Sequence, residues 1–160
     1  MHDKATKFLN DINTLEESVI PSSEKFSDYS QIVGQLAKNG ANYQVDQQKI
    51  DSLRDYYNSF MQSIDEAIVQ LSKLKEFDTS FNILKPSISH MEIVKDSYVS
   101  TTPANLFVYK IGWTKANDSL KNIINEESKT FSNRLMLASR QREIKESETK
   151  KFMTKYKLSY

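Results

Sequence analysis

Apolar side chains recur at steps of three and four residues through most of the chain, which is the spacing of one face of an α-helix. The first such stretch covers residues 3–18, and Pro21 is expected to end it because proline lacks an amide proton. A second, short helix is predicted from about Ser22 to the sequence KNGAN, where Gly40 is placed to adopt a left-handed cap. The chain is therefore expected to begin with two short helices.

A longer stripe predicts a central helix over about residues 43–77. Its apolar positions alternate by three and four over four heptads, which is typical of coiled coils and long bundles. A helix of about 35 residues would be about 50 Å long, whereas a compact domain of this size is about 40 Å across. We therefore expect an elongated molecule. The residues expected to pack on other helices or on a partner form the central seam: Ile50, Leu53, Tyr57, Phe60, Ile64, Leu71 and Leu74.

Residues 78–103 differ from the rest because they hold two of the three prolines and many serines and threonines. We interpret them as an internal linker with one short helix around Met91–Val99. Two alternatives remain for the next segment of the chain. Either Pro103 opens a long helix, or residues 97–111 form a small β-hairpin, since apolar side chains alternate over Phe107–Trp113 as on one face of a strand.

From about residue 113 the spacing predicts a long C-terminal helix that reaches about residue 158 and that, in the first alternative, begins already at residue 103. Residues 139–160 are basic and have almost no apolar stripe before Phe152, so we expect them to protrude as a helical tail. The predicted fold class is all-α: one domain over residues 1–160, built as an elongated antiparallel helical bundle or coiled coil.

Composition agrees with this fold. The chain has only three glycines and three prolines, too few for the many turns of a β-sandwich or barrel. It has no cysteine, which excludes disulfides, thiolate metal sites and cysteine nucleophiles. No apolar run has the length of a signal peptide core or a membrane span, so we expect a cytoplasmic protein.

Charge is distributed unevenly along the chain. Residues 1–80 carry 8 Lys and Arg against 13 Asp and Glu, whereas residues 129–160 carry 9 against 3. Such a split favours head-to-tail or antiparallel self-association, or a basic end that binds an anionic partner. A solvated helix that complements the acidic half is the simpler interpretation.

The basic end contains the candidate surface for an anionic partner. Cations interleaved with aromatic rings suit nucleic acid or the surface of an anionic membrane, although three interspersed glutamates weaken the nucleic-acid interpretation. Long antiparallel helices with a basic region resemble curvature-binding dimers of the BAR kind, but no residue motif accompanies this likeness. We refer to the following residues as the basic set: Arg134, Arg140, Arg142, Lys145, Lys150, Lys151, Lys155 and Lys157.

Side chains that carry chemistry are scarce. His2 and His90 are the only histidines, and a lone histidine in a linker is expected to be structural. Acidic pairs such as Asp65–Glu66 are expected to face water, and the Glu-x-x-His motif of di-iron bundles is missing. No glycine loop for phosphate and no zinc motif is present. We therefore expect no catalytic site, metal, cofactor or small-molecule substrate.

These patterns support two hypotheses of function. The first is a non-enzymatic helical interaction protein, such as an adaptor, scaffold or assembly subunit, that forms a homo-oligomer or binds a helical protein partner. Its eight tyrosines and eight phenylalanines supply aromatic rings for a core or for interface anchors. The alternative is a protein that binds a membrane surface or nucleic acid through the basic set.

Overall fold

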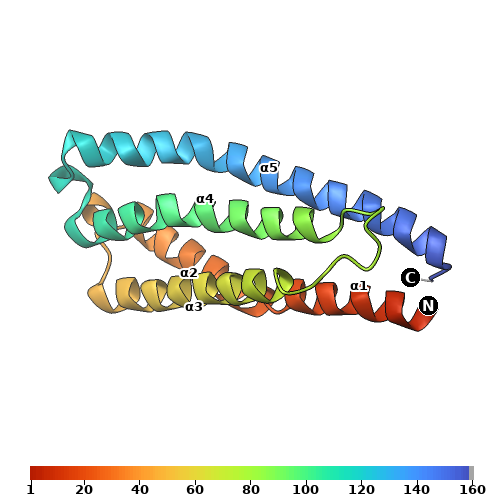
Figure 1. The fold of residues 1–160 in the computed structure, drawn as a ribbon. Coiled ribbons are helices and arrows are strands. Elements are labelled where there is room, and N and C mark those ends of the chain that lie inside the picture. Colours follow the sequence, from red (N-terminus) through yellow and green to blue (C-terminus); the bar gives the residue numbers. More distant parts are fainter. Residues whose placement is uncertain (159–160) are drawn as a thin grey trace.

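The computed structural model describes residues 1–158 and contains four antiparallel rods of helix (Figure 1). Within these residues no strand forms, so the prediction of an elongated all-α bundle is confirmed and the hairpin at 97–111 is wrong. The first rod is broken into two helices, and two short 3₁₀ turns lie near one end of the bundle. The elements in order are α1 (His2–Glu17), α2 (Ile20–Asn39), η1 (Ala41–Tyr43), α3 (Gln47–Leu71), α4 (Leu84–Ile111), η2 (Trp113–Lys115) and α5 (Asp118–Tyr156).

The first rod breaks close to the predicted place. Pro21 lies in the first turn of α2, where its missing amide proton costs no helical hydrogen bond. The second helix therefore begins at Ile20, just before the proline, and no serine side chain caps it. Ser22 Oγ instead bonds to Ser63 Oγ of α3 at 2.6 Å, which ties the break to the neighbouring rod.

The central helix α3 is shorter than the predicted 43–77. It begins at Gln47 because the side chain of Asp46 accepts a hydrogen bond from the amide of Gln48 at 2.8 Å, a typical N-cap. It ends at Leu71, so Leu74 lies beyond the helix while still packing against the core. The elongation of the molecule comes instead from α5, whose 39 residues span about 58 Å.

The predicted linker is the segment where the structure differs most from the sequence-based prediction. Only residues 72–83 connect α3 to the next rod, and residues 84–103 belong to the 28-residue helix α4. Pro103 lies inside this helix rather than at its start. Ser87, Ser97 and Thr101 donate hydrogen bonds to backbone carbonyl groups four residues earlier, so their hydroxyl groups are satisfied within the helix.

The final helix α5 begins at Asp118, where the side chain of Asn117 accepts from the amide of Leu120 at 2.8 Å. The alternative in which the C-terminal helix begins at residue 103 is therefore wrong. The predicted start near residue 113 is slightly early, because the short 3₁₀ turn η2 precedes α5. Gly112 ends α4 with φ of 86°, a value that favours glycine.

The two loops at this end of the bundle interlock. Asn42 accepts a hydrogen bond from the amide of Thr114 at 2.6 Å, and the amide of Val45 donates to Tyr109 O at 3.0 Å. Gly40, for which a left-handed conformation was predicted, is extended, and Asn42 adopts the left-handed conformation with φ of 61°. The α2–α3 turn is thus fixed by the α4–α5 turn.

The C-terminal segment does not protrude as predicted. Phe152 is completely buried, with ring centroids of Phe8, Phe77, Phe81 and Tyr156 between 4.7 and 5.9 Å away. This aromatic group joins α1, the connection after α3, and the end of α5, which lie together at one end of the molecule (Figure 1). Ser159 and Tyr160, the last residues of the predicted tail, lie outside the described residues.

Candidate partner-binding surface

The central seam is occupied by the chain's own core. Ile50, Leu53, Phe60, Ile64 and Leu71 are each exposed by 3 % or less, and Tyr57 and Leu74 pack partly buried against the same core. Burial also raises the pKa of the Tyr57 hydroxyl, although nearby Lys95 opposes this. The seam therefore has no free apolar face to offer to a partner.

Most of the basic set is paired with the chain's own carboxylates. Lys145 Nζ lies 2.5 Å from Glu16 Oε2 of α1, and Lys155 Nζ lies 2.5 Å from Asp78 Oδ2 in the connection after α3. Arg142 and Lys151 pair with glutamates on α5 itself in exposed contacts, which contribute little to stability. Two cations of the basic set, Lys145 and Lys155, thus connect α5 to other parts of the bundle.

The other residues of the basic set have different surroundings. Arg134 forms an ion pair with Glu127 beside α4. Arg140, Lys150 and Lys157 are exposed and form no ion pair with any residue in the range 1–158. Arg140 and Lys150 are separated by about 15 Å along α5. The structure therefore does not gather the basic set into one patch.

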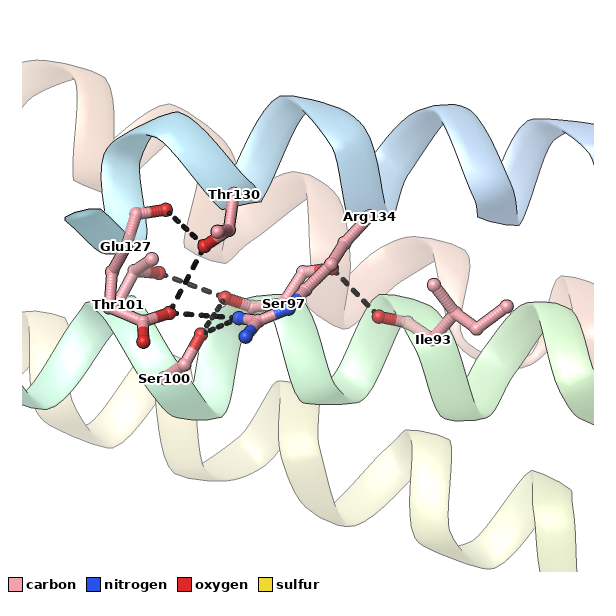
Figure 2. A network of polar contacts seen from close by, with 7 residues as sticks. All are labelled: Ile93, Ser97, Ser100, Thr101, Glu127, Thr130 and Arg134. Carbon is pink, nitrogen blue, oxygen red and sulfur yellow. Dashed lines mark hydrogen bonds and ion pairs between the residues drawn. The ribbon is translucent and has the colours of Figure 1, made fainter.

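A polar network joins α4 to α5 in the middle of their contact (Figure 2). Arg134 Nη1 donates to Glu127 Oε2 at 2.9 Å and also to Ser100 Oγ, so the guanidinium bridges the two helices. Hydrogen bonds from Ser100 and Arg134, together with the positive charge of Arg134, lower the pKa of the Glu127 carboxyl. The ion pair remains about one-third exposed, so it is reachable from outside.

An apolar row lies on the flank of α5 beside this network. Ile123, Leu137 and Ile144 are exposed by 49, 48 and 46 %, whereas the residues that face the core, such as Ala138, are buried. Steps of seven residues place side chains nearly above one another along a helix, and the half-buried Thr130 fills the one remaining step. We call Ile123, Thr130, Leu137 and Ile144 the α5 row; it is about 32 Å long.

The α5 row was not predicted from the sequence. The residues expected at a partner surface, the central seam and the basic set, include none of Ile123, Leu137 and Ile144. The apolar residues of α5 that face the core and those of the α5 row alternate along the sequence. Only the seven-residue spacing distinguishes the α5 row. Met136, which is 53 % exposed on a different side of α5, does not belong to the row and offers a matched control.

A second exposed apolar group lies where α2 passes α3. Ile32 and Leu36 of α2 are 51 and 40 % exposed, and the rings of Tyr29 and Tyr56 pack together at 5.1 Å. This group spans only about two helical turns on α2, and its two tyrosine rings already pack against each other. It is a smaller surface than the α5 row.

The main pocket is at the break between α1 and α2, with a volume of about 500 Å³. Buried apolar side chains form part of its wall, while Glu16, Arg142 and Lys145 line it with charge. His90 also lines it, and its Nδ1 donates to Ala138 O at 2.8 Å, which bridges α4 and α5. Glu17 lines it as well, so two carboxylates stand against two cations, and Glu16 is paired with Lys145.

Neither a metal site nor a relative identifies the protein. Within residues 1–158, no three His, Asp or Glu side chains gather as a metal would require. No helix in this range combines the length and the apolar character needed to cross a membrane. No family model, curated protein or solved structure matches the chain.

Proposed function

We propose that the protein is a non-enzymatic helical interaction protein that receives an amphipathic helix along the α5 row. The observation that carries this proposal is the half-exposed Ile123, Leu137 and Ile144 at heptad spacing. A helix with its own apolar stripe can pack along such a row, because side chains repeating every seven residues stay in contact along paired helices.

The surroundings of the row add specificity. The Glu127–Arg134 pair borders it and is partly exposed, so a partner can bring polar groups that hydrogen-bond to it. Arginine beside apolar anchors is a frequent arrangement in protein interfaces. The Ser100 contact holds the Arg134 side chain on α4 before any partner arrives, which lowers the entropy lost on binding.

The expected binding is weak. Covering the exposed halves of three large apolar side chains contributes roughly 2–5 kcal/mol, whereas association costs roughly 4–15 kcal/mol. Polar contacts at the flanks must therefore supply part of the affinity, and the complex is expected to be transient. An adaptor or assembly subunit that exchanges partners fits this expectation.

We do not extend the proposal to membranes or nucleic acid. A phosphate-binding surface needs cations that are free to face it, and the structure pairs Lys145 and Lys155 with carboxylates of α1 and of the connection after α3. Arg140, Lys150 and Lys157 remain exposed but are dispersed along the end of the chain.

The test compares two neighbouring substitutions of similar exposure. Leu137→Glu places a charge in the row, and Met136→Glu places the same charge beside it. Tagged wild-type protein and both variants are expressed in the organism of origin, and captured proteins are quantified by mass spectrometry.

We expect the wild type and Met136→Glu to capture the same partner and Leu137→Glu to lose most of it. Circular dichroism and thermal unfolding check that all three proteins fold alike. Equal recovery of every captured protein by both variants would refute a role of the row.

A further inference from the structure

The α5 row is nearly symmetric about its midpoint. It runs Ile123, Thr130, Leu137, Ile144, with isoleucine at both ends and threonine and leucine between. When a second copy of α5 lies antiparallel on it, Ile123 of one copy meets Ile144 of the other, and Thr130 meets Leu137. This is the one antiparallel alignment that pairs all four row positions, and its midpoint lies between Asn133 and Arg134.

The outer flank of the row carries charges that suit the same alignment. Glu126 and Arg140 each lie about 40–60° around the helix from their neighbours in the row, on the side away from α4, since residues three or four positions apart differ by these angles at 3.6 residues per turn. Both are exposed, and they lie almost equally far from the midpoint. In the antiparallel pair, Glu126 of each copy therefore faces Arg140 of the other, which gives two symmetric ion pairs.

The present partners of these two residues do not compete strongly. Among residues 1–158, Glu126 forms an ion pair with Lys129 alone, with side chains that are 68 and 71 % exposed, and such pairs are weak. Arg140 forms no ion pair among residues 1–158. The antiparallel alignment thus gives Arg140 the carboxylate partner that it lacks among the described residues 1–158.

A parallel alignment lacks this complementarity. In a parallel, in-register pair, residues on opposite flanks of the row meet across the interface, which brings Glu126 of one copy near Glu127 of the other. Because Glu127 is already paired with Arg134 of its own chain, Glu126 gains no cationic partner in the parallel alignment. In the antiparallel pair, the two Arg134 side chains approach the midpoint, but each is already neutralised by its own Glu127 at 2.9 Å.

We infer that the occupant of the α5 row is a second copy of this chain, bound antiparallel about a two-fold axis between Asn133 and Arg134. This inference rests on the proposed function, since the row must first be a contact surface. A two-fold pair uses the same patch on both copies, as closed dimers do. Its small area places it among weak, transient interfaces, so covalent trapping at high protein concentration is the suitable probe.

The absence of cysteine makes a register-specific test available. Two single variants, Ile123→Cys and Ile144→Cys, are prepared separately and treated with a short bis-maleimide, first alone and then as an equal mixture. Antiparallel pairing brings residue 123 of one copy beside residue 144 of the other. Two copies of residue 123 lie about 32 Å apart in this pair, beyond a short cross-linker.

We expect covalent dimer from the mixture and little from either variant alone. A mixture of Ile123→Cys with Met136→Cys serves as the matched control and should give only the yield of random collisions. Adding Arg140→Glu to both cysteine variants should lower the yield several-fold, and adding Glu126→Arg together with Arg140→Glu should restore it. Circular dichroism confirms that each variant is folded.

Three outcomes would overturn the inference. Cross-linking of each variant with itself at the yield of the mixture would show a parallel pair. A yield of covalent dimer from the mixture equal to that of the control would show that the copies do not pair in this way. If Leu137→Glu nevertheless loses a captured protein, the row binds another partner and the proposed function stands. If no protein is lost either, both proposals fail.

Discussion

At the scale of single residues, Phe152 and Asp78 explain why the end of the chain is docked. Phe152 is fully buried among rings from three parts of the chain. Asp78 accepts hydrogen bonds from Lys155 Nζ at 2.5 Å and Tyr156 Oη at 2.7 Å. The burial of Phe152 and the hydrogen bonds to Asp78 thus both hold the last turns of α5 against the bundle.

Replacing Phe152 by alanine tests the contribution of its burial. The change leaves a cavity where α1, α5 and the connection after α3 meet, so we expect the free energy of unfolding to fall by about 3–5 kcal/mol. Urea denaturation measures this loss, and Met136→Ala on the exposed side of α5 should cost less than about 0.5 kcal/mol. A loss below about 1 kcal/mol for Phe152→Ala would show that the segment is not docked.

The contacts of Asp78 with Lys155 and Tyr156 predict that the stability of the fold depends on pH. Hydrogen bonds from Lys155, Tyr156 and Ser80 hold the pKa of the Asp78 carboxyl well below its ordinary value of 3.8 in the folded protein. Below the ordinary pKa the unfolded chain therefore binds more protons than the folded chain. The stability that Asp78 provides is fully present at neutral pH and is lost as the pH falls below about 4 toward the lower folded pKa.

Asp78→Asn isolates this effect. We expect the difference in the free energy of unfolding between wild type and Asp78→Asn to be largest at about pH 7 and clearly smaller at about pH 2.5, by chemical denaturation at each pH. The exposed Asp55 supplies a control, since Asp55→Asn removes a carboxylate that forms no hydrogen bond or ion pair among the described residues. A difference that does not change with pH would contradict the assigned role.

At the scale of elements, the two turns at the interlocked end act as one unit. Gly112 has a positive φ, and a Cβ built on it would lie 2.3 Å from Asn42 Nδ2. Gly112 combines this φ with ψ of 150°, a conformation found essentially only in glycine. Gly112→Ala is therefore expected to lower the free energy of unfolding by more than the roughly 1–3 kcal/mol cost of that backbone conformation alone. The side chain of Asn42 accounts for the excess.

A double-mutant cycle separates the two contributions. In an Asn42→Gly background the side-chain clash is absent and only the 3.1 Å approach to the backbone oxygen of residue 42 remains. Gly112→Ala should therefore cost less than in the wild type, and the two substitutions should not add. Thermal or urea unfolding of the four proteins gives the coupling. Simple additivity would mean that the turns do not touch as described.

The elements also show what the sequence could and could not reveal. The stripe of α3 predicted its core side chains correctly because that helix buries one continuous face, as Ile50 and Ile64 illustrate. Helix α4 packs on both α3 and α5, so its buried residues form no single stripe. Its serines and Pro103 resemble a loop in composition, although Ser87 and Ser97 are buried with their hydroxyl groups bonded to the helix.

At the scale of the whole molecule, the charge split along the sequence is used largely inside one chain. Lys145 of the basic end meets Glu16 of the acidic half, and Lys155 meets Asp78. The split predicted contacts between opposite charges but could not distinguish pairing within the chain from pairing between copies. The α5 row could not be predicted because its outward direction depends on which flank α4 covers.

The most direct test of the account places a photo-activated cross-linking residue, such as benzoylphenylalanine, at position 137 in one strain and at position 136 in another. Both residues are about half exposed and adjacent on α5, so the two probes are equally accessible but point to different sides of the helix. Illumination of living cells and mass spectrometry identify what each position touches. The account predicts a defined product from position 137, either the chain's own α5 or a helix of another protein, and only background from position 136. Equal products from both positions, or none from either, would contradict it.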